Sequence, residues 1–157
     1  MSKTTTLVRI VANYGHQYLG LLNDSRTDDE QPQWVQLVAR GKKQGYAVGD
    51  VVQVTLTNTS STPAQGAIEK VHERRNLFYR SEFNKQKNLA ANIDQVAIIC
   101  ATEPGFSEEL LGRALICAHV ADIEALIVLN KIDVAELLPF ARERLALYQS
   151  LGYRVIE

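Results

Sequence analysis

The segment that most restricts the fold of this chain is residues 125–129 (ALIVL), an unbroken apolar run that leads directly into Asn130-Lys131-Ile132-Asp133. A short apolar run bounded by a polar turn predicts a strand that is buried in a parallel sheet. In open α/β sheets, ligands bind just beyond the carboxyl ends of such strands. The polar turn therefore stands where a parallel sheet holds its ligand.

The pattern Asn-Lys-x-Asp at the end of a buried strand indicates recognition of guanine. Guanine offers N1–H and its exocyclic amine as adjacent donors, and the ionised Asp133 can accept both. Adenine has an acceptor at N1, so a site built around the carboxylate rejects it by roughly 10⁴-fold. We expect Asn130 to support the loop and the N7/O6 edge, and the aliphatic stem of Lys131 to cover the base.

A simpler interpretation stays open from the residues alone. Asn130–Asp133 is also a plausible polar turn, with Asp133 as the N-cap of a following helix. Moreover, neither Gly-x-x-x-x-Gly-Lys-Ser/Thr nor Asp-x-x-Gly, which a GTPase needs for phosphate and metal, occurs in the 157 residues. The nearest match, at Gly41-Lys42-Lys43, has Gln36 in place of the first glycine and Lys43 in place of the hydroxyl residue.

Composition indicates a folded protein of a reducing compartment. Hydrophobic residues make up 46% and charged residues 22%, which excludes wholesale disorder, and the net charge of −1 is unlike that of a strongly basic nucleic-acid-binding protein. No apolar stretch approaches 18 residues and no signal core begins the chain, so we expect a cytoplasmic protein without membrane contact. Two cysteines make no disulfide framework, and Cys117 with His119 makes no zinc site.

Residues 1–80 predict an all-β domain, with residues 81–91 as a linker. Gly45 and Gly49 mark turns between the strands. Five short strands in about 75 residues suggest a small closed barrel, of the oligonucleotide-binding (OB) type or, alternatively, SH3-like. The expected strands are residues 4–13, 18–22, 33–40, 50–57 and 66–71.

Residues 92–157 have the pattern of an α/β domain. Ser107 predicts the start of the first helix, and Pro139 is expected to kink or delay the second. We expect strand 96–101 to be covered on both faces, and the sheet to be only part of a doubly wound domain, so that the chain ends inside it. The expected elements are strands at 96–101, 125–129 and 153–156 and helices from 107 and over 134–151.

Three segments together resemble the RsgA/YjeQ family: residues 71–75 (VHERR), 90–95 (AANIDQ) and 130–133 (NKID). Residues 40–42, the Gly49-Asp50 turn and Arg113 also fit its pattern. The resemblance implies a circularly permuted GTPase that assists late assembly of the small (30S) ribosomal subunit. It further implies an OB barrel, then a P-loop-type α/β GTPase domain whose base-reading motif precedes its phosphate loop, and a C-terminal zinc domain.

The resemblance carries only three nucleotide-site residues onto this chain: Asn130, Lys131 and Asp133. It implies GTP and GDP as ligands, with Mg²⁺ and a structural Zn²⁺ only in the complete protein. The phosphate loop, switch segments and zinc ligands are expected beyond Glu157, so we expect no catalytic residue, no metal ligand and no GTP hydrolysis by this truncated chain alone.

The resemblance also implies that the barrel contacts ribosomal RNA of the small subunit, and that the protein is a monomer. OB barrels bind nucleic acid with aromatic side chains and cations near their second and third strands. The acidic loop 24–30 is expected to point away from RNA. The alternative is a stand-alone RNA-binding protein whose α/β half is vestigial. The candidate RNA contacts are Tyr18, Trp34, Arg40, Lys42, Lys43, Arg74 and Arg75.

Overall fold

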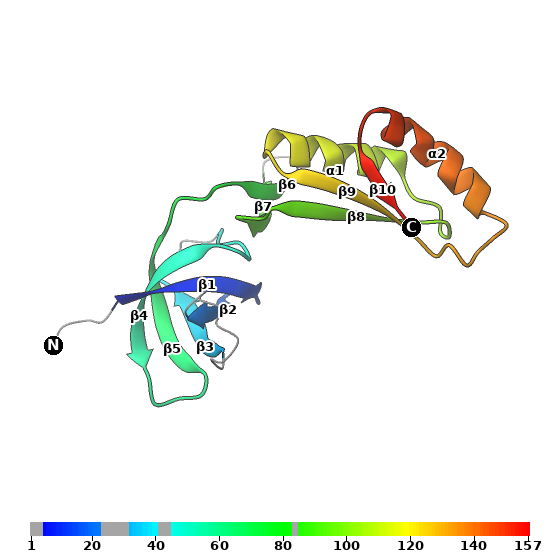
Figure 1. Cartoon of the computed structure of the whole chain (residues 1–157). Helices are drawn as coiled ribbons and strands as arrows, with labels where there is room; N and C mark the ends of the chain where they lie inside the picture. The colour runs from blue at the N-terminus through cyan, green and yellow to red at the C-terminus, as the bar shows by residue number, and fades with distance from the viewer. Residues whose placement is uncertain (1–4, 23–31, 41–44, 83–84) are drawn as a thin grey trace. The chain divides into compact units, whose positions relative to one another are not determined.

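The computed structural model describes residues 5–22, 32–40, 45–82 and 85–157. It divides into two compact units, Met1–Asn92 and Ile93–Glu157. Figure 1 names the helices and strands of both units.

The first unit is built on a closed five-stranded barrel with the strand order β1-β2-β3-β5-β4. Neighbouring strands are antiparallel except for β3 and β5, which are parallel. The five strands predicted from the sequence are confirmed to within about two residues at their ends, and the barrel is of the OB type. The strands are β1 (Thr5–Asn13), β2 (Gln17–Leu22), β3 (Gln33–Ala39), β4 (Val51–Asn58) and β5 (Ala64–Val71).

Alternating side chains of these strands fill the barrel. In β4, Val52 and Val54 are fully buried, whereas the intervening Gln53 is only half-buried. This is the period-two pattern of a strand with one face toward the core. The buried core consists of Val8, Ile10, Tyr18, Val35, Leu37, Tyr46, Val52, Val54 and Ile68.

Residues 81–91, which we expected to be a linker, contain strand structure. β6 (Leu77–Glu82) and β7 (Lys85–Ala91) form a two-stranded antiparallel sheet. The sequence KQKN at 85–88 has no alternation of polar and apolar residues, so nothing local predicted a strand. The tertiary contacts of β7 with the barrel explain it, because Ala91 N–H donates to the Val48 carbonyl at 2.8 Å.

A buried ion pair closes the end of the barrel beside this sheet. Asp50 is fully buried, and its carboxylate accepts from Arg74 Nε and Nη2, both at 2.7 Å, and from Ala47 N–H at 2.8 Å. Gly49, with φ +91°, has no room for a side chain, because a Cβ there would lie 1.9 Å from the Ala91 carbonyl oxygen. The Gly49-Asp50 turn is therefore a packing element of the first unit.

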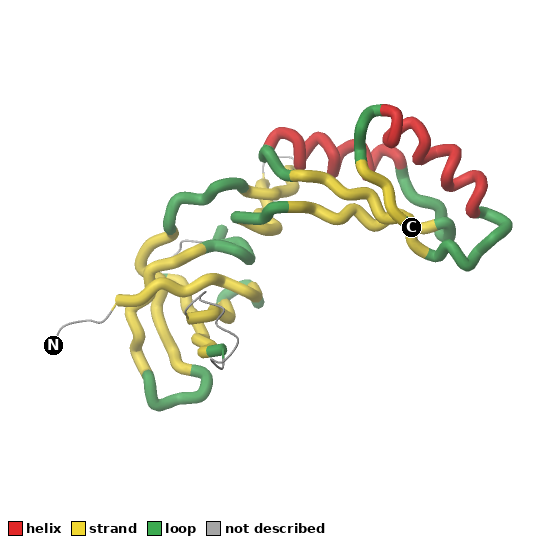
Figure 2. The backbone as a smooth tube through the Cα atoms, viewed as in Figure 1, coloured by secondary structure: helices red, strands yellow, loops and turns green. Residues whose placement is uncertain are grey.

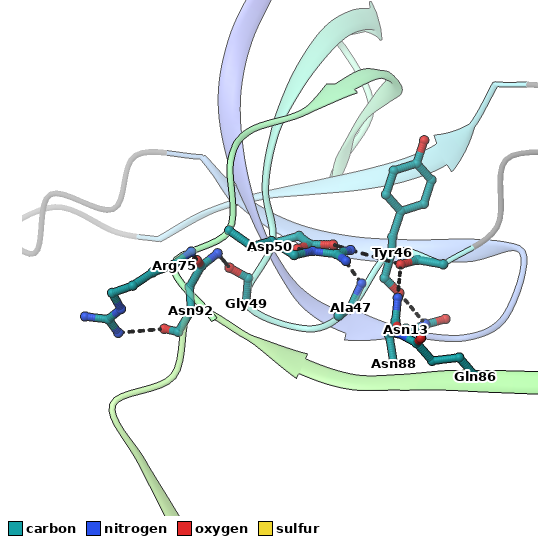
Figure 3. A network of polar contacts seen from close by, with 11 residues as sticks. Asn13, Tyr46, Ala47, Gly49, Asp50, Arg75, Gln86, Asn88 and Asn92 are labelled. Atoms are coloured by element: carbon teal, nitrogen blue, oxygen red, sulfur yellow. Dashed lines mark hydrogen bonds and ion pairs between the residues drawn. The ribbon is translucent and has the colours of Figure 1, made fainter. Parts of the chain in front are cut away.

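Asn92, the last residue of the first unit, joins this turn to the segment before β6 (Figure 3). Its side-chain amide donates to the Gly49 carbonyl at 2.9 Å and accepts from Arg75 N–H at 2.8 Å. Asn88 donates to the Gly45 carbonyl at 2.7 Å. These bonds attach the β6–β7 sheet to the barrel.

The second unit is a three-stranded parallel sheet in the order β10-β9-β8 with two helices. The predicted elements are confirmed. Ser107 caps α1 by accepting from Leu110 N–H, and Pro139 stands in the first turn of α2, which starts at Leu138 and not at 134. The elements are β8 (Gln95–Ala101), α1 (Glu108–Val120), β9 (Glu124–Asn130), α2 (Leu138–Ser150) and β10 (Arg154–Ile156).

Both helices cover the same face of this sheet (Figure 1). Right-handed crossovers between strands added in one direction put successive helices on one side. Cys100 of β8 and Ile127 of β9 face them and are buried, whereas Ile99 is 60% exposed on the other face. The expectation that strand 96–101 is covered on both faces is therefore wrong for this structure.

Candidate guanine and RNA sites

The Asn-Lys-x-Asp motif lies at the carboxyl end of the sheet. Asn130 is the last residue of β9 and pairs in register with Ala101, the last residue of β8. The chain then leaves the strand through Lys131, whose φ is +60°. This left-handed conformation costs a residue with a side chain roughly 1–2 kcal/mol, so the surrounding bonds must hold it. Residues 131–137 form the loop between β9 and α2 (Figure 2).

Hydrogen bonds fix the backbone at the start of this loop. Asn130 Oδ1 accepts from Lys131 N–H at 2.8 Å. The Lys131 carbonyl accepts from Val134 N–H at 3.1 Å, which closes a turn around Asp133, and from the Thr102 hydroxyl at 2.8 Å. Thr102 N–H also donates to the Asn130 carbonyl at 3.3 Å. The end of β8 thus holds the start of the loop.

The side chains of Asn130, Lys131 and Asp133 are all exposed. Asp133 does not cap α2, because the N-cap of that helix is Leu137 and no side chain bonds there. Among the residues that the structure describes, none donates a hydrogen bond to the Asp133 carboxylate or forms an ion pair with it. The carboxylate therefore keeps its acceptor capacity for a ligand with two adjacent donors.

Strands β2 and β3 of the barrel each carry one aromatic residue that was predicted to contact RNA. Of these two residues, Trp34 is the exposed one. It is 43% exposed and lines a hollow of about 540 Å³ together with Leu19, Pro32 and Pro63. A second hollow of about 270 Å³ shares Leu19 and Pro63 with the first. The second hollow is also lined by Tyr14, Gln17, Tyr18 and Gln36.

Tyr18 was a candidate for stacking on RNA, and the structure places it in the core instead. It is 3% exposed and meets Tyr46 edge to face, with ring centroids 5.4 Å apart. Burial, and then the neighbouring Tyr46, raises the pKa of Tyr18 above its ordinary value. Tyr14, four residues earlier, is 72% exposed beside Gln17 and is the aromatic residue that sequence reasoning missed.

The cationic side chains that were predicted to contact RNA differ in the partners that they bind. Arg74 donates to the buried Asp50 carboxylate and to the Gly45 carbonyl, so its guanidinium has a structural role, and its hydrogen bonds to Asp50 raise its pKa further. Arg75 donates to the Asn92 carbonyl at 3.3 Å. Arg40 pairs with Glu69 at 2.8 Å while remaining about half exposed. Lys42, Lys43 and the loop 24–30 lie outside the described residues.

The described residues include no group of three or more His, Cys, Asp or Glu side chains that could hold a metal ion. Cys100 is buried, and burial raises the pKa of its thiol. In the same part of the chain, no helix is long and apolar enough to cross a membrane. The described residues thus offer no cluster of the kind that a structural Zn²⁺ site requires.

Comparison with known proteins gives matches over nearly all of the chain. A family model described as RsgA GTPase matches residues 71–157. The small ribosomal subunit biogenesis GTPase RsgA of Burkholderia pseudomallei is 48% identical over 149 residues, which are 95% of this chain and 44% of that protein. The protein of the same description from Ralstonia nicotianae is 47% identical over 148 residues, 94% of this chain and 43% of that protein.

Two solved structures share the fold. YjeQ from Thermotoga maritima matches with a TM-score of 0.63 and 22% identity, over 97% of this chain and 51% of that one. YloQ, described as a circularly permuted GTPase, matches with a TM-score of 0.59 and 22% identity, over 98% of this chain and 51% of that one. The chain spans less than half the length of the curated relatives it matches.

Proposed function

This chain belongs to the RsgA GTPase family, and on that premise we propose that it reads a guanine base through Asn130, Lys131 and Asp133. In the full protein this site serves a GTPase that assists maturation of the small ribosomal subunit. The observation that carries the proposal is the Asp133 carboxylate, which is exposed beyond the carboxyl end of β9, the central strand of the sheet, and has no partner among the described residues.

The chemistry of the site is selection and not bond cleavage. Asp133 accepts from N1–H and the exocyclic amine of guanine, Asn130 supports the loop and the N7/O6 edge, and the stem of Lys131 covers the ring. The 157 residues contain no phosphate loop pattern, so nothing in them cradles the β- and γ-phosphates. We propose that the chain by itself binds guanine nucleotides weakly and does not hydrolyse GTP.

Replacement of one carboxylate oxygen of Asp133 by an amide NH₂ group tests this assignment. The Asp133→Asn variant turns an acceptor into a donor, so preference should move from GMP to xanthosine monophosphate, which has a carbonyl in place of the amine. Binding is measured by chemical-shift titration of the labelled chain. Asp122→Asn is the matched control, because Asp122 is also exposed, lies in the same unit and has φ +53°, which asparagine tolerates. An Asp133→Asn chain that still prefers GMP removes Asp133 from the site.

We also propose that the barrel contacts ribosomal RNA through the face around Trp34. The support is an exposed tryptophan over a hollow on the β2–β3 face, with Tyr14 beside it. OB barrels bind single strands on this face, and stacking of a base on an aromatic ring contributes about 1–3 kcal/mol. Arg40, Arg75, Lys42 and Lys43 remain the proposed contacts to phosphates.

Because Trp34 is the only tryptophan, its fluorescence reports on this face directly. A single-stranded RNA should quench it, whereas polyphosphate, which has charge but no bases, should not. Trp34→Ala should weaken RNA binding roughly tenfold or more, as measured by anisotropy of labelled RNA. Leu7→Ala is the control, since Leu7 is an exposed apolar residue of β1. RNA that binds without quenching Trp34 would place the contact elsewhere.

We further propose a cytoplasmic protein that acts on the small ribosomal subunit as a monomer, with GTP and GDP as its nucleotides and Mg²⁺ and Zn²⁺ held by the full protein. The description of its relatives as small ribosomal subunit biogenesis GTPases supports the ribosomal role and the guanine nucleotides. The alternative function, a stand-alone RNA-binding protein with a vestigial α/β half, makes an opposite prediction. It requires RNA binding at the barrel and no preference for guanine at residues 130–133.

A further inference from the structure

The loop that carries Asp133 is held by a residue of the neighbouring strand. Thr102 directly follows β8, and its backbone N–H donates to the Asn130 carbonyl at 3.3 Å. Its hydroxyl donates to the Lys131 carbonyl at 2.8 Å. Thr102 is 6% exposed, so this hydroxyl bond is shielded from water.

The Lys131 carbonyl, which accepts from the Thr102 hydroxyl, also closes the turn that contains Asp133. The Lys131 carbonyl accepts from Val134 N–H at 3.1 Å, and this bond closes the turn of residues 131–134. Lys131 has φ +60°, a conformation that costs a residue with a side chain roughly 1–2 kcal/mol. The Thr102 hydroxyl therefore stabilises the peptide group that closes the turn containing Asp133.

The register of the sheet explains why this residue reaches the loop. Ala101 pairs with Asn130, so β8 and β9 end at the same level, and the next residue of each strand lies side by side. A valine at 102 would fill the same volume, but it would leave the Lys131 carbonyl with one donor fewer. The hydroxyl is thus not needed to fill the core of the unit.

We propose that Thr102 is a positioning residue for guanine selection, which acts through the Lys131 carbonyl without touching the base. This inference rests on the proposed function of the Asn130–Asp133 motif. Thr102, at the end of β8, thus contributes to base selection although it lies outside the motif.

The test compares GMP with inosine monophosphate, which lacks the exocyclic amine, by chemical-shift titration of the labelled chain. Asp133 can accept two donors from GMP and only one from inosine monophosphate, so the ratio of the two affinities measures how well Asp133 is placed. In Thr102→Val the GMP affinity should fall about tenfold and the ratio should shrink by a similar factor, which is the worth of roughly one hydrogen bond. Thr102→Ser, which keeps the hydroxyl, should restore most of both.

A second readout needs no nucleotide. In the free chain the Val134 amide should exchange its hydrogen with solvent about tenfold faster in Thr102→Val than in the original chain or in Thr102→Ser. Thr55→Val is the matched control, since Thr55 is also 6% exposed and its hydroxyl donates to Glu69 at 2.8 Å in the barrel. That variant should change neither the GMP ratio nor the exchange of Val134.

The outcomes separate the two proposals. If the original chain shows no preference for GMP over inosine monophosphate, the proposed function fails, and the role of Thr102 fails with it. If the original chain prefers GMP and Thr102→Val keeps the same ratio and the same Val134 exchange, only the inference about Thr102 is overturned. A Thr102→Val chain that has lost its folded spectrum is replaced in this comparison by Thr102→Ala, judged against Thr102→Ser.

Discussion

The two units solve the same problem, the burial of strand side chains, in different ways. The barrel closes on itself, so each strand has a neighbour on both sides and one face is entirely inside. The three-stranded sheet has helices on one face only, and Ile99 and Ile156 remain exposed on the other. The contrast shows that the barrel is closed by its own residues, whereas the sheet exposes apolar surface on one face.

The difference extends to polar groups. The barrel buries a charge, Asp50, and satisfies it with Arg74 and a backbone amide. In the second unit the important polar groups lie at the rim, where Thr102 is buried but Asp133 is exposed. In the first unit, buried polar groups specify the structure. In the second unit, exposed polar groups on a loop whose backbone is fixed by hydrogen bonds are available for binding.

The largest expected effect comes from breaking the ion pair of the barrel. Arg74→Ala leaves the fully buried Asp50 without its partner and should lower the free energy of unfolding by about 3–5 kcal/mol. The unfolding of this unit is followed by Trp34 fluorescence in urea. Arg40→Ala is the control, because the Arg40 side chain is 52% exposed and its partner Glu69 is only partly buried, so this pair should contribute at most about 1 kcal/mol. Equal losses in the two variants would contradict a structural role of Arg74.

Two isoleucines, one on each face of the sheet, show how much each face contributes to the free energy of unfolding. Ile127 is fully buried, so Ile127→Ala should cost about 2–5 kcal/mol, whereas Ile99→Ala, at a side chain 60% exposed, should cost less than about 1 kcal/mol. Unfolding of this unit is followed by thiol labelling of Cys100, which is buried and whose pKa burial raises. A large loss in Ile99→Ala would mean that this face is covered in solution.

The smallest effect concerns alkaline pH. Burial raises the pKa of Tyr18 and of Tyr46 above the ordinary value of 10.0. The folded barrel therefore keeps protons that the unfolded chain releases, so this contribution to stability is complete below about pH 10 and is lost as the pH rises through the folded pKa values. The urea midpoint of Trp34 fluorescence should begin to fall as the pH rises above about 10. Tyr18→Phe should show a smaller fall, and an identical one would exclude Tyr18 as a cause.

The sequence was sufficient for most elements because their signals are local. Alternation predicted the barrel strands, and Ser107 predicted the start of α1. Pro139 was expected to kink or delay the second helix, but the predicted start at 134 is four residues before the observed start at Leu138. The β6–β7 sheet was missed because its residues 85–88 are polar, and its pairing depends on contacts of Asn88 and Ala91 with the barrel. Such contacts between distant residues leave no periodic pattern.

The sites show the same limit. Asn130, Lys131 and Asp133 form a contiguous motif, so the sequence was enough to propose them. Tyr18 and Arg74 have side chains suited to RNA, and only the structure revealed that one belongs to the core and the other to a buried ion pair. Thr102 could have been proposed from the expected pairing of the two strands. A polar residue that directly follows one apolar strand lies beside the end of the neighbouring strand.

We propose that the second unit, and not the barrel, selects guanine. The most direct test is titration of the ¹⁵N-labelled chain with GMP and with AMP, followed by two-dimensional NMR, with affinity for GMP expected to be on the order of millimolar. We expect saturable shifts of the amides of residues 130–134 and Thr102 with GMP, and none of these shifts with AMP. Equal shifts with both nucleotides, or GMP shifts confined to the barrel, would contradict it.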